Sequence, residues 1–522
     1  MTGGQPVEGT LSVPMISRQL AAEGVQKIFI VTDEPQKYAG VEDLAPDVPI
    51  RHRNELNGIE RELREHPGVT ALIYDQTCAA EKRRRRKRHE YPDPPVRAFI
   101  NESVCEGCGD CSAKSNCMSV VPVETEFGRK RAIDQSSCNK DYSCVLGFCP
   151  SFVTVEGGKL REGKAVVLQE EGLGNLPDPR VPALHKPYGI LVTGVGGTGV
   201  VTIGTLLGLA AHMEGKGVSV LDMAGLAQKG GPVWSHIRIY DNPEEVHATR
   251  IADGEANAII GCDIVVTVAV ETLAKTRAGM TGAIVNTDFS VTSDYIRALS
   301  AQAETGDLVR HPDPQFPVDK LQQDVVEAVG TGNAEFFAAT RLATALMGDS
   351  IATNAFMLGY AYQKGLVPLS LTSLHQAIEL HGVAVDATKR ALLWGRRAAH
   401  DLPAVEKTAA QAIPDDEKLS ADLDELIDRR VRDLTAYQNA AYARRYTRLL
   451  DRVRAREAQL RPGSTRLTEA VARYYYKVLS YKDEYEVARL YTDGAYLKNL
   501  RATFEGDFKV YFHMAPPLWA KP

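Results

Sequence analysis

The spacing of the cysteines is the feature of this sequence that most directly suggests chemistry. Seven of the nine cysteines lie between residues 105 and 149. In INESVCEGCGDCSAKSNCMSV, three of them follow one another at C-x2-C-x2-C spacing, and a more distant cysteine in GFCPSF precedes a proline. Three such thiolates can wrap one face of a cuboidal cluster, and the cysteine before proline can supply the fourth ligand. We therefore predict one 4Fe-4S cluster held by Cys105, Cys108, Cys111 and Cys149.

The three other cysteines of this region are Cys117, Cys138 and Cys144, one thiolate short of a second cubane cluster. A second cluster could take a non-cysteine ligand or contain three irons, or these cysteines could flank a single cluster. Zinc is the alternative for the whole region, because paired C-x2-C knuckles are typical of zinc sites. The triple spacing and the Cys-Pro pair favour iron and sulfur. Cys262, within the apolar strand IIGCDIVV, is expected to be a buried core residue.

A glycine-rich loop is the second chemical signal. In VTGVGGTGVV the glycines Gly194, Gly196, Gly197 and Gly199 follow an apolar strand and precede a helix, and Asp222 ends the next strand. This pattern matches the dinucleotide-binding fingerprint, in which glycines allow a tight turn and the helix amino terminus attracts phosphate. The same geometry also serves domains that only lie beside a diphosphate. A flavin- or NAD(P)-dependent iron-sulfur reductase is therefore an alternative function.

A turn downstream of the glycine loop carries hydrogen-bonding and basic groups. It contains Gln228, Lys229, Gly230 and Gly231, and Ser235 and His236 follow in WSHIRIY. Such a turn could face an anion. The residue types favour a plain β-turn that enters a strand.

The elements around these sites indicate a multidomain α/β chain. Near the start, VQKIFIVTD, ELNGIERELREH and ALIYDQTC predict a β-α-β unit, and the charged, proline-rich EKRRRRKRHEYPDPP predicts a linker. Two strand-like pieces, VRAFINES and SFVTVEGGKL, flank the cysteines, and an open α/β domain begins at YGILVTGVGG. In the tail, the apolar stripe of Leu423, Leu426, Ile427, Val431 and Leu434 predicts helices.

Composition narrows the class of protein. The chain has 522 residues, a net charge of -6, 44% hydrophobic and 25% charged residues, which is typical of a globular protein and excludes a disordered tail or a nucleic-acid coat. No apolar run reaches the length of about 18 residues that a membrane span needs, and the first residues lack a signal-peptide pattern. We expect a cytoplasmic protein without membrane or nucleic-acid partners.

The basic run Lys82–Arg88 admits three interpretations. It could be a solvated linker, a docking patch for an acidic ferredoxin, or a nucleic-acid tract, and the acidic whole disfavours the last.

In its order of parts the sequence resembles the 2-oxoacid:ferredoxin oxidoreductases, and in detail the carboxy-terminal half of the fused indolepyruvate type. The likeness rests on YDQTCAAEKRRRRKRHEYP, SSCNKDYSCVLGFCPSFVTVEGG, GVGGTGVV with AQKGGPVWSHIR, and SYKDEYEVARLY with FEGDF. The resemblance implies oxidative decarboxylation of a 2-oxo acid, with electrons passing through 4Fe-4S clusters to ferredoxin and the acyl group passing to coenzyme A. Indolepyruvate or another arylpyruvate is the substrate that it implies. It assigns no catalytic residue.

The resemblance also predicts a division into segments. We expect a carboxy-terminal remnant of a thiamine-diphosphate-binding domain at 1–91, a ferredoxin-like 4Fe-4S module at 92–163, a linker at 164–186, an open, Rossmann-like gamma-type α/β domain at 187–383, and a helical carboxy-terminal domain at 384–522.

One departure from the family concerns thiamine diphosphate. Met1 and the MTGGQ segment resemble the interior of the thiamine domain, after the residues that hold its Mg²⁺. Thr2, Gly3, Gly4 and Gln5 are therefore expected to border the diphosphate only in an assembled enzyme, and a separate subunit is expected to carry the remaining thiamine-binding and pyrimidine-binding parts. A non-catalytic, zinc-bearing assembly subunit is the further alternative.

Overall fold

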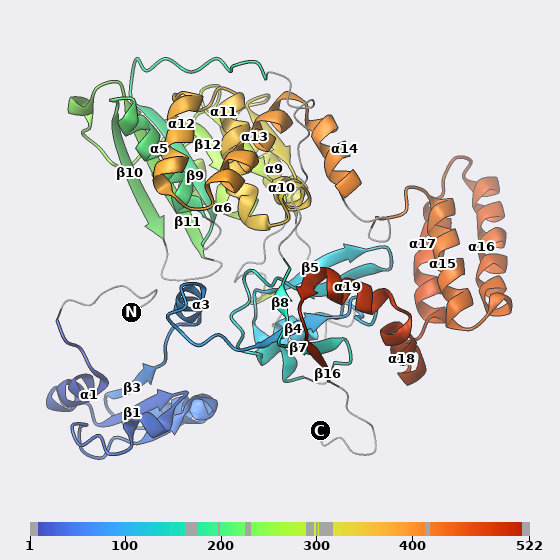
Figure 1. Cartoon of the computed structure of the whole chain (residues 1–522), viewed down its shortest axis with the longest axis horizontal. Coiled ribbons are helices and arrows are strands. Elements are labelled where there is room, and N and C mark those ends of the chain that lie inside the picture. The colour runs from blue at the N-terminus through green and yellow to red at the C-terminus, as the bar shows by residue number, and fades with distance from the viewer. Residues whose placement is uncertain are drawn as a thin grey trace. The chain divides into compact units, whose positions relative to one another are not determined.

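A computed structural model of the chain divides into two compact units, Met1–Asp93 and Pro94–Pro522 (Figure 1). None of the helices in the described part of the chain is long and apolar enough to cross a membrane. The structure describes residues 9–147, 149–161, 176–196, 199–224, 231–288, 297–298, 301, 317–412 and 418–513.

The first unit contains a three-stranded parallel sheet in the order β2-β1-β3. The apolar run of β1 is buried, and α2 places Leu56, Ile59 and Leu63 against Phe29 and Val31. This packing confirms the predicted β-α-β unit. The elements of the sheet and its helices are α1 Val13–Ala22, β1 Lys27–Thr32, β2 Ile50–His52, α2 Leu56–Glu65 and β3 Thr70–Asp75.

The charge run that follows is helical. Helix α3 spans Ala79–Lys87, so the prediction that this segment is an irregular linker was wrong. Glu81 forms ion pairs with Arg84 and Arg85, three and four residues further along the helix. Arginine is a good helix former, and such pairs add a few tenths of a kcal/mol each, about 0.2–0.5. The prolines begin only after the helix has ended.

The cysteine-containing module is built from three small sheets. β4 and β7 confirm the two predicted strands, and the hairpin β5-β6 lies between the cysteine loops. The last strands in the described part of the chain, β15 and β16, pair with β8 and β7. The predicted carboxy-terminal domain is therefore not purely helical, because its end completes the cysteine module. The strands are β4 Val96–Ile100, β5 Val120–Thr125, β6 Gly128–Ile133, β7 Phe152–Glu156, β8 Lys159–Leu160, β15 Phe504–Glu505 and β16 Lys509–Phe512.

The α/β domain contains a six-stranded mixed sheet in the order β10-β11-β9-β12-β13-β14. β11 is antiparallel to both of its neighbours, whereas β9, β12, β13 and β14 run parallel to one another. The predicted Rossmann-like sheet is corrected in this respect, since an antiparallel strand lies between the first two strands. The strands are β9 Tyr188–Val195, β10 Gly217–Ala224, β11 Pro232–Tyr240, β12 Ala256–Gly261, β13 Gly282–Asn286 and β14 Ala334–Phe337.

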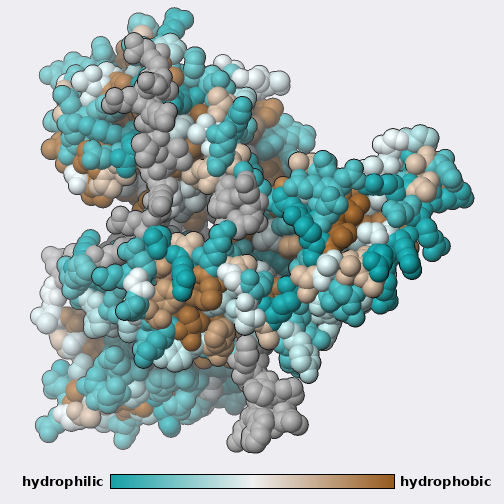
Figure 2. Space-filling view, turned by 45° about the vertical axis from the view of Figure 1, so that its right-hand side comes forward, coloured by the Kyte–Doolittle hydropathy of each residue, from teal (hydrophilic) through white to brown (hydrophobic). Residues whose placement is uncertain are grey.

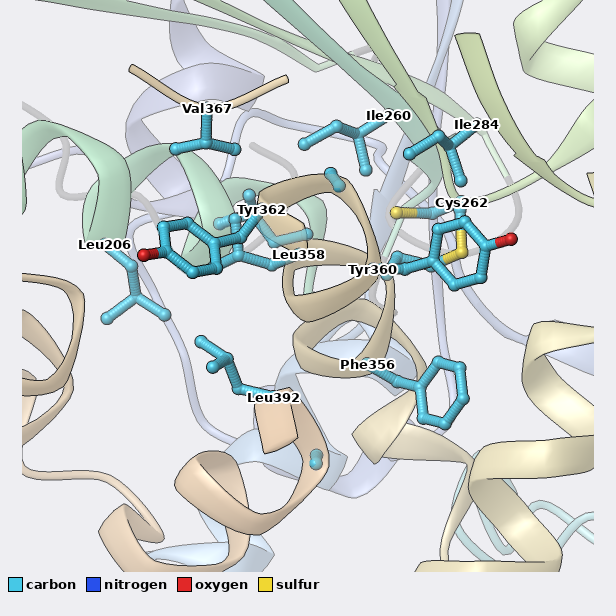
Figure 3. Packing of buried hydrophobic residues seen from close by; sticks show 14 of the residues in the cluster. Leu206, Ile260, Cys262, Ile284, Phe356, Leu358, Tyr360, Tyr362, Val367 and Leu392 are labelled. Carbon is cyan, nitrogen blue, oxygen red and sulfur yellow. The ribbon is translucent and has the colours of Figure 1, made fainter. Parts of the chain in front are cut away.

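Helices cover both faces of this sheet. On one face, α11 lies in the centre of the largest core, where Phe356, Leu358 and Tyr360 pack near Ile260 and Ile284 of the sheet (Figure 3). On the other face, α6 and α9 pack against Leu191, Ile259 and Val285. The helices are α5 Val200–Met213, α6 Ile264–Thr267, α7 Val270–Leu273, α9 Val318–Val329, α10 Ala339–Met347, α11 Thr353–Gln363 and α12 Leu371–His381.

The α/β domain continues past residue 383, where its end was predicted. Helices α13, Val385–His400, and α14, Leu402–Ala412, bury Leu392, Trp394 and Val405 in the same core as α11. α13 lies so close to α11 that a Cβ on Gly395 would come 1.9 Å from the carbonyl oxygen of Phe356. The core therefore includes both helices.

The rest of the tail is helical, as predicted. α15, α16 and α17 form a small bundle whose core includes Leu426, Leu434, Tyr446 and Ala472. α18 and α19 pack instead against β7 of the cysteine module. On the face drawn in Figure 2 the surface is largely hydrophilic and is interrupted by smaller hydrophobic patches. The helices are α15 Leu423–Tyr437, α16 Ala440–Leu460, α17 Arg466–Leu479, α18 Glu484–Thr492 and α19 Ala495–Thr503.

Candidate functional site

The first cysteine loop follows β4 and leads into the short helix α4, Asp110–Ser115. Its two glycines have positive φ, +69° at Gly107 and +81° at Gly109. A Cβ on Gly107 would lie 2.1 Å from the carbonyl oxygen of Arg129 in β6. Only glycine fits this backbone and this close approach, so the loop can curl tightly against the hairpin.

Three of the four cysteines predicted to hold the first cluster, Cys105, Cys111 and Cys149, belong to one packed cluster of side chains. The pKa of the Cys111 thiol is raised to about 12, mainly by burial, with smaller contributions from Cys105, Cys108 and Cys149. These thiols interact electrostatically although Cys149 is distant in the sequence. Because burial and the neighbouring thiols disfavour ionisation of Cys111, a cationic partner would favour its thiolate form.

A second group forms around Cys144, in the turn η3, Ser143–Val145. The pKa of Cys144 is raised to about 12, mainly by burial, with smaller contributions from Cys117, Cys138 and then Asp141. Cys117 and Cys144 belong to the same packed cluster of side chains as Cys105, Cys111 and Cys149. Asp141 was missed in the sequence analysis, although its position between Cys138 and Cys144 was the available signal.

The surroundings of the two groups are apolar. Ala98, Ile100, Val120 and Phe152 pack against five of the cysteines. Such a shell keeps water away from a cluster and is one of the features that set its reduction potential.

Two buried cations from β6 lie beside the first group. Lys130 and Arg131 are 6% and 1% exposed, and the charge of Arg131 lowers the pKa of Cys111. Lys130 Nζ donates to the carbonyl oxygen of Cys105 at 2.7 Å, and Lys482 Nζ donates to the same oxygen at 3.2 Å. A cluster with four thiolates is anionic, so buried cations offset its charge. The donors, the shell and the charges all fit an iron-sulfur cluster.

Among the described residues, no group of three or more His, Cys, Asp or Glu side chains is arranged so that it could hold a metal ion.

The glycine loop connects β9 to α5, as predicted. Gly196 N–H donates to the carbonyl oxygen of Gly231 at 2.7 Å, and Gly199, at φ +107°, precedes the helix. A Cβ on Gly194 would come 2.7 Å from Val200 Cγ2, so glycine allows the helix to approach the strand. Gly197 lies outside the described residues. Asp222, on β10, is separated from β9 by the whole of β11, unlike the acidic residue of a dinucleotide fold.

The other residues that the sequence suggested for a site are either buried in the fold or lie outside the described residues. Ser235 and His236 lie buried within β11, which confirms the plain strand interpretation. Cys262 is also buried and points into the core drawn in Figure 3, and burial raises the pKa of its thiol. Both observations confirm a structural role for Cys262. Thr2, Gly3, Gly4 and Gln5 lie outside the described residues, as do Gln228, Lys229 and Gly230.

Comparison with known proteins shows which protein family the α/β domain resembles. Residues 189–398 match the family model described as pyruvate ferredoxin/flavodoxin oxidoreductase. An indolepyruvate oxidoreductase subunit, IorB, from Methanothermobacter thermautotrophicus is 31% identical over 214 residues, which cover 41% of this chain and 97% of the relative. The chain belongs to the 2-oxoacid:ferredoxin oxidoreductase family. IorB from Thermococcus kodakarensis is 28% identical over 219 residues, covering 42% of this chain and 98% of that relative.

Two solved structures align with part of the chain at low similarity. The pyruvate oxidoreductase subunit PORC of Thermotoga maritima aligns at a TM-score of 0.28 and 21% identity, covering 41% of this chain and 96% of that one. The gamma subunit of a keto/oxoacid ferredoxin oxidoreductase from Geobacter sulfurreducens aligns at a TM-score of 0.27 and 20% identity, covering 41% and 98%. Residues 423–522 match a family of unknown function, DUF6537.

Proposed function

We propose that this chain is the electron-transferring component of a 2-oxoacid:ferredoxin oxidoreductase that oxidises indolepyruvate or another arylpyruvate. Electrons would pass through 4Fe-4S clusters held by the cysteine module and leave to ferredoxin. The observation that carries the proposal is the packing of Cys149 with Cys105 and Cys111 in a chain whose α/β domain is of the gamma type.

Different parts of this chain would bind the clusters and contact the cofactor. The cysteine module would hold the clusters in an apolar shell, and Lys130 and Arg131 would offset their negative charge. The glycine loop with Gly194, Gly196, Gly197 and Gly199 would lie beside the diphosphate of a bound cofactor.

In the assembled enzyme, thiamine diphosphate with Mg²⁺ would supply the nucleophilic carbon and the electron sink that the decarboxylation of a 2-oxo acid needs. We propose that a subunit carrying thiamine-binding and pyrimidine-binding domains is the partner of this chain, and that coenzyme A accepts the acyl group. The preference for indolepyruvate is inferred from the names of the IorB relatives.

Anaerobic purification followed by iron, sulfide and zinc analysis and a visible spectrum tests the cluster content. We expect a brown protein without flavin bands. A flavin spectrum would favour the reductase alternative, and a colourless zinc protein would favour a non-catalytic assembly subunit. Cys108→Ser should lower the iron and sulfide content, whereas Cys78→Ser, which changes a cysteine outside the cysteine module, should leave both unchanged.

Activity should be measured after co-expression with the thiamine-binding partner. Indolepyruvate with coenzyme A should reduce ferredoxin faster than pyruvate does. Equal rates would contradict the proposed substrate class, and no ferredoxin reduction with any 2-oxo acid by a cluster-loaded complex would contradict the proposed reaction.

A further inference from the structure

The two cysteine loops have the same sequence frame. The first is Cys105-x2-Cys108-x2-Cys111, and the second is Cys138-x2-Asp141-x2-Cys144. Asp141 therefore occupies the position that Cys108 holds in the first loop.

The backbone repeats this frame residue by residue. Gly107 and Gly109 have φ of +69° and +81°, and the residues at the corresponding positions, Lys140 and Tyr142, have φ of +55° and +59°. In both loops the second positive-φ residue immediately precedes a helical turn, α4 in the first and η3 in the second.

The loops also make the same bond to sulfur. The N–H of Gly107 donates to Cys105 Sγ at 3.3 Å, and the N–H of Lys140 donates to Cys138 Sγ at 3.4 Å. Backbone N–H groups directed at cysteine sulfur stabilise the thiolate form and help to set the potential of a cluster.

This conformation is costly in the second loop, because neither Lys140 nor Tyr142 is glycine. In the left-handed region the Cβ of a residue with a side chain lies too close to its own backbone, which disfavours this conformation. The fold holds both residues there through their side chains, since Lys140 Nζ donates to the carbonyl oxygen of Pro94 at 3.3 Å and Tyr142 Oη to that of Val96 at 2.8 Å. Such retained strain is typical of functional sites.

The environment of Asp141 matches that of Cys108. Both side chains are exposed, whereas Cys105 and Cys144 are buried. Asp141 accepts hydrogen bonds from Ser143 N–H at 3.2 Å and from Ser143 Oγ at 3.0 Å, and both bonds use Oδ1. Neither of these two bonds uses the other carboxylate oxygen, Oδ2.

We propose that Asp141 is the fourth ligand of a second 4Fe-4S cluster, whose other ligands are Cys117, Cys138 and Cys144. This inference rests on the proposed function, in which the module holds iron-sulfur clusters. Thiolate is a softer ligand than carboxylate and suits cluster iron better, so the iron bound to Asp141 should be the most easily lost. When the cluster gives one electron to an oxidant and releases that iron as Fe²⁺, a three-iron cluster with charge +1 remains from a four-iron cluster of charge +2.

The test compares anaerobically purified protein with three variants by iron and sulfide analysis and by electron paramagnetic resonance, before and after mild oxidation with ferricyanide. The wild-type protein should lose about one iron per chain on oxidation and develop a three-iron signal. Asp141→Cys should keep its iron and develop no such signal. Asp141→Asn should contain the three-iron cluster already before oxidation.

Asp110→Asn is the matched control, because it removes an equal charge beside Cys111 at a position that is not a proposed ligand. It should behave like the wild type. Indistinguishable behaviour of wild type, Asp141→Cys and Asp141→Asn, with the first cluster still present, would overturn the assignment of Asp141 alone. A protein that binds no iron after anaerobic reconstitution would overturn the proposed function as well.

Discussion

Arg430 of α15 forms an ion pair with Glu126, which lies at the turn between β5 and β6. Its Nη1 donates to Glu126 Oε1 at 2.5 Å, and its Nη2 donates to the carbonyl oxygen of the same residue at 2.7 Å. The guanidinium also lies over the rings of Phe127 and Tyr476. Arg430 and Glu126 are 2% and 8% exposed as side chains, so the pair is buried. The helical bundle is thereby fastened to the hairpin that carries Lys130 and Arg131.

Breaking this pair should loosen the hairpin. Arg430→Met leaves the Glu126 carboxylate buried without its main partner, which costs about 3–5 kcal/mol in comparable cases. Hydrogen exchange of residues 120–133 should become faster, with the folded α/β domain unaffected. Arg454→Met removes an exposed pair with Asp424 in the same bundle and should change stability by at most about 1 kcal/mol. Equal exchange in the two variants would show that the buried pair does not hold the hairpin.

The close contact between α11 and α13 should not tolerate a glycine-to-alanine substitution, which adds a methyl group between the two helices. A Cβ on Gly359 would lie 2.0 Å from the carbonyl oxygen of Leu392, and one on Gly395 would meet the backbone of α11. Gly395→Ala should therefore push the helices apart and destabilise the domain by about 1–3 kcal/mol, despite the better helix propensity of alanine. Urea unfolding followed by the fluorescence of Trp394 measures this loss. Arg390→Ala, on the exposed side of the same helix, is the control, and equal midpoints would contradict the prediction.

Acid should weaken the α/β domain through His236. Burial, with smaller effects from the charges of Arg250 and Lys275, lowers the pKa of His236 to about 4 from its ordinary 6.5. The neutral ring accepts the N–H of Ile251 through Nδ1 at 3.3 Å. Between pH 6.5 and 4 the His236 side chain is protonated in the unfolded chain but neutral in the folded chain. The contribution of neutral His236 to the free energy of unfolding is therefore complete above pH 6.5 and is lost as the pH falls toward 4.

Unfolding midpoints at several pH values between 7 and 4 measure the effect of His236. In His236→Gln the fall in stability across this range should be smaller, although the variant is less stable at pH 7. An unchanged slope would mean that other groups carry the acid sensitivity.

Neutralising the basic face of α3 should slow electron delivery if the helix binds an acidic ferredoxin. Replacing Arg83, Arg84, Arg85 and Arg86 by glutamine should reduce the rate of ferredoxin reduction at low salt, and the difference should shrink as salt rises, because charges in solvent are screened. Arg444, Arg448 and Arg452, exposed on α16, provide a control with a similar loss of charge. Equal rates for both variants at low salt would exclude α3 as the docking patch.

Short-range features of this protein could be read from the sequence. The β1-α2-β3 unit follows from an apolar strand and an amphipathic helix. The glycines on either side of Cys108 indicate a backbone conformation with positive φ, which only glycine adopts easily. The cysteine spacing led to the prediction that Cys149 joins Cys105, Cys108 and Cys111 as a ligand, and Cys149 packs in the same cluster as Cys105 and Cys111. Helix α3 shows where this approach failed, because a run of like charges was taken as irregular although Glu81 pairs with arginines one turn away.

Only the tertiary structure decided the features that depend on distant segments. The insertion of β11 between β9 and β10, the return of β15 and β16 to the cysteine module, and the buried position of Arg131 all result from packing between residues far apart in the chain. Strand order and burial are set by which surfaces exclude water together, and local residue patterns do not specify this. The sequence by itself determined which residues are candidate iron ligands, whereas the fold decided which apolar and charged side chains surround them.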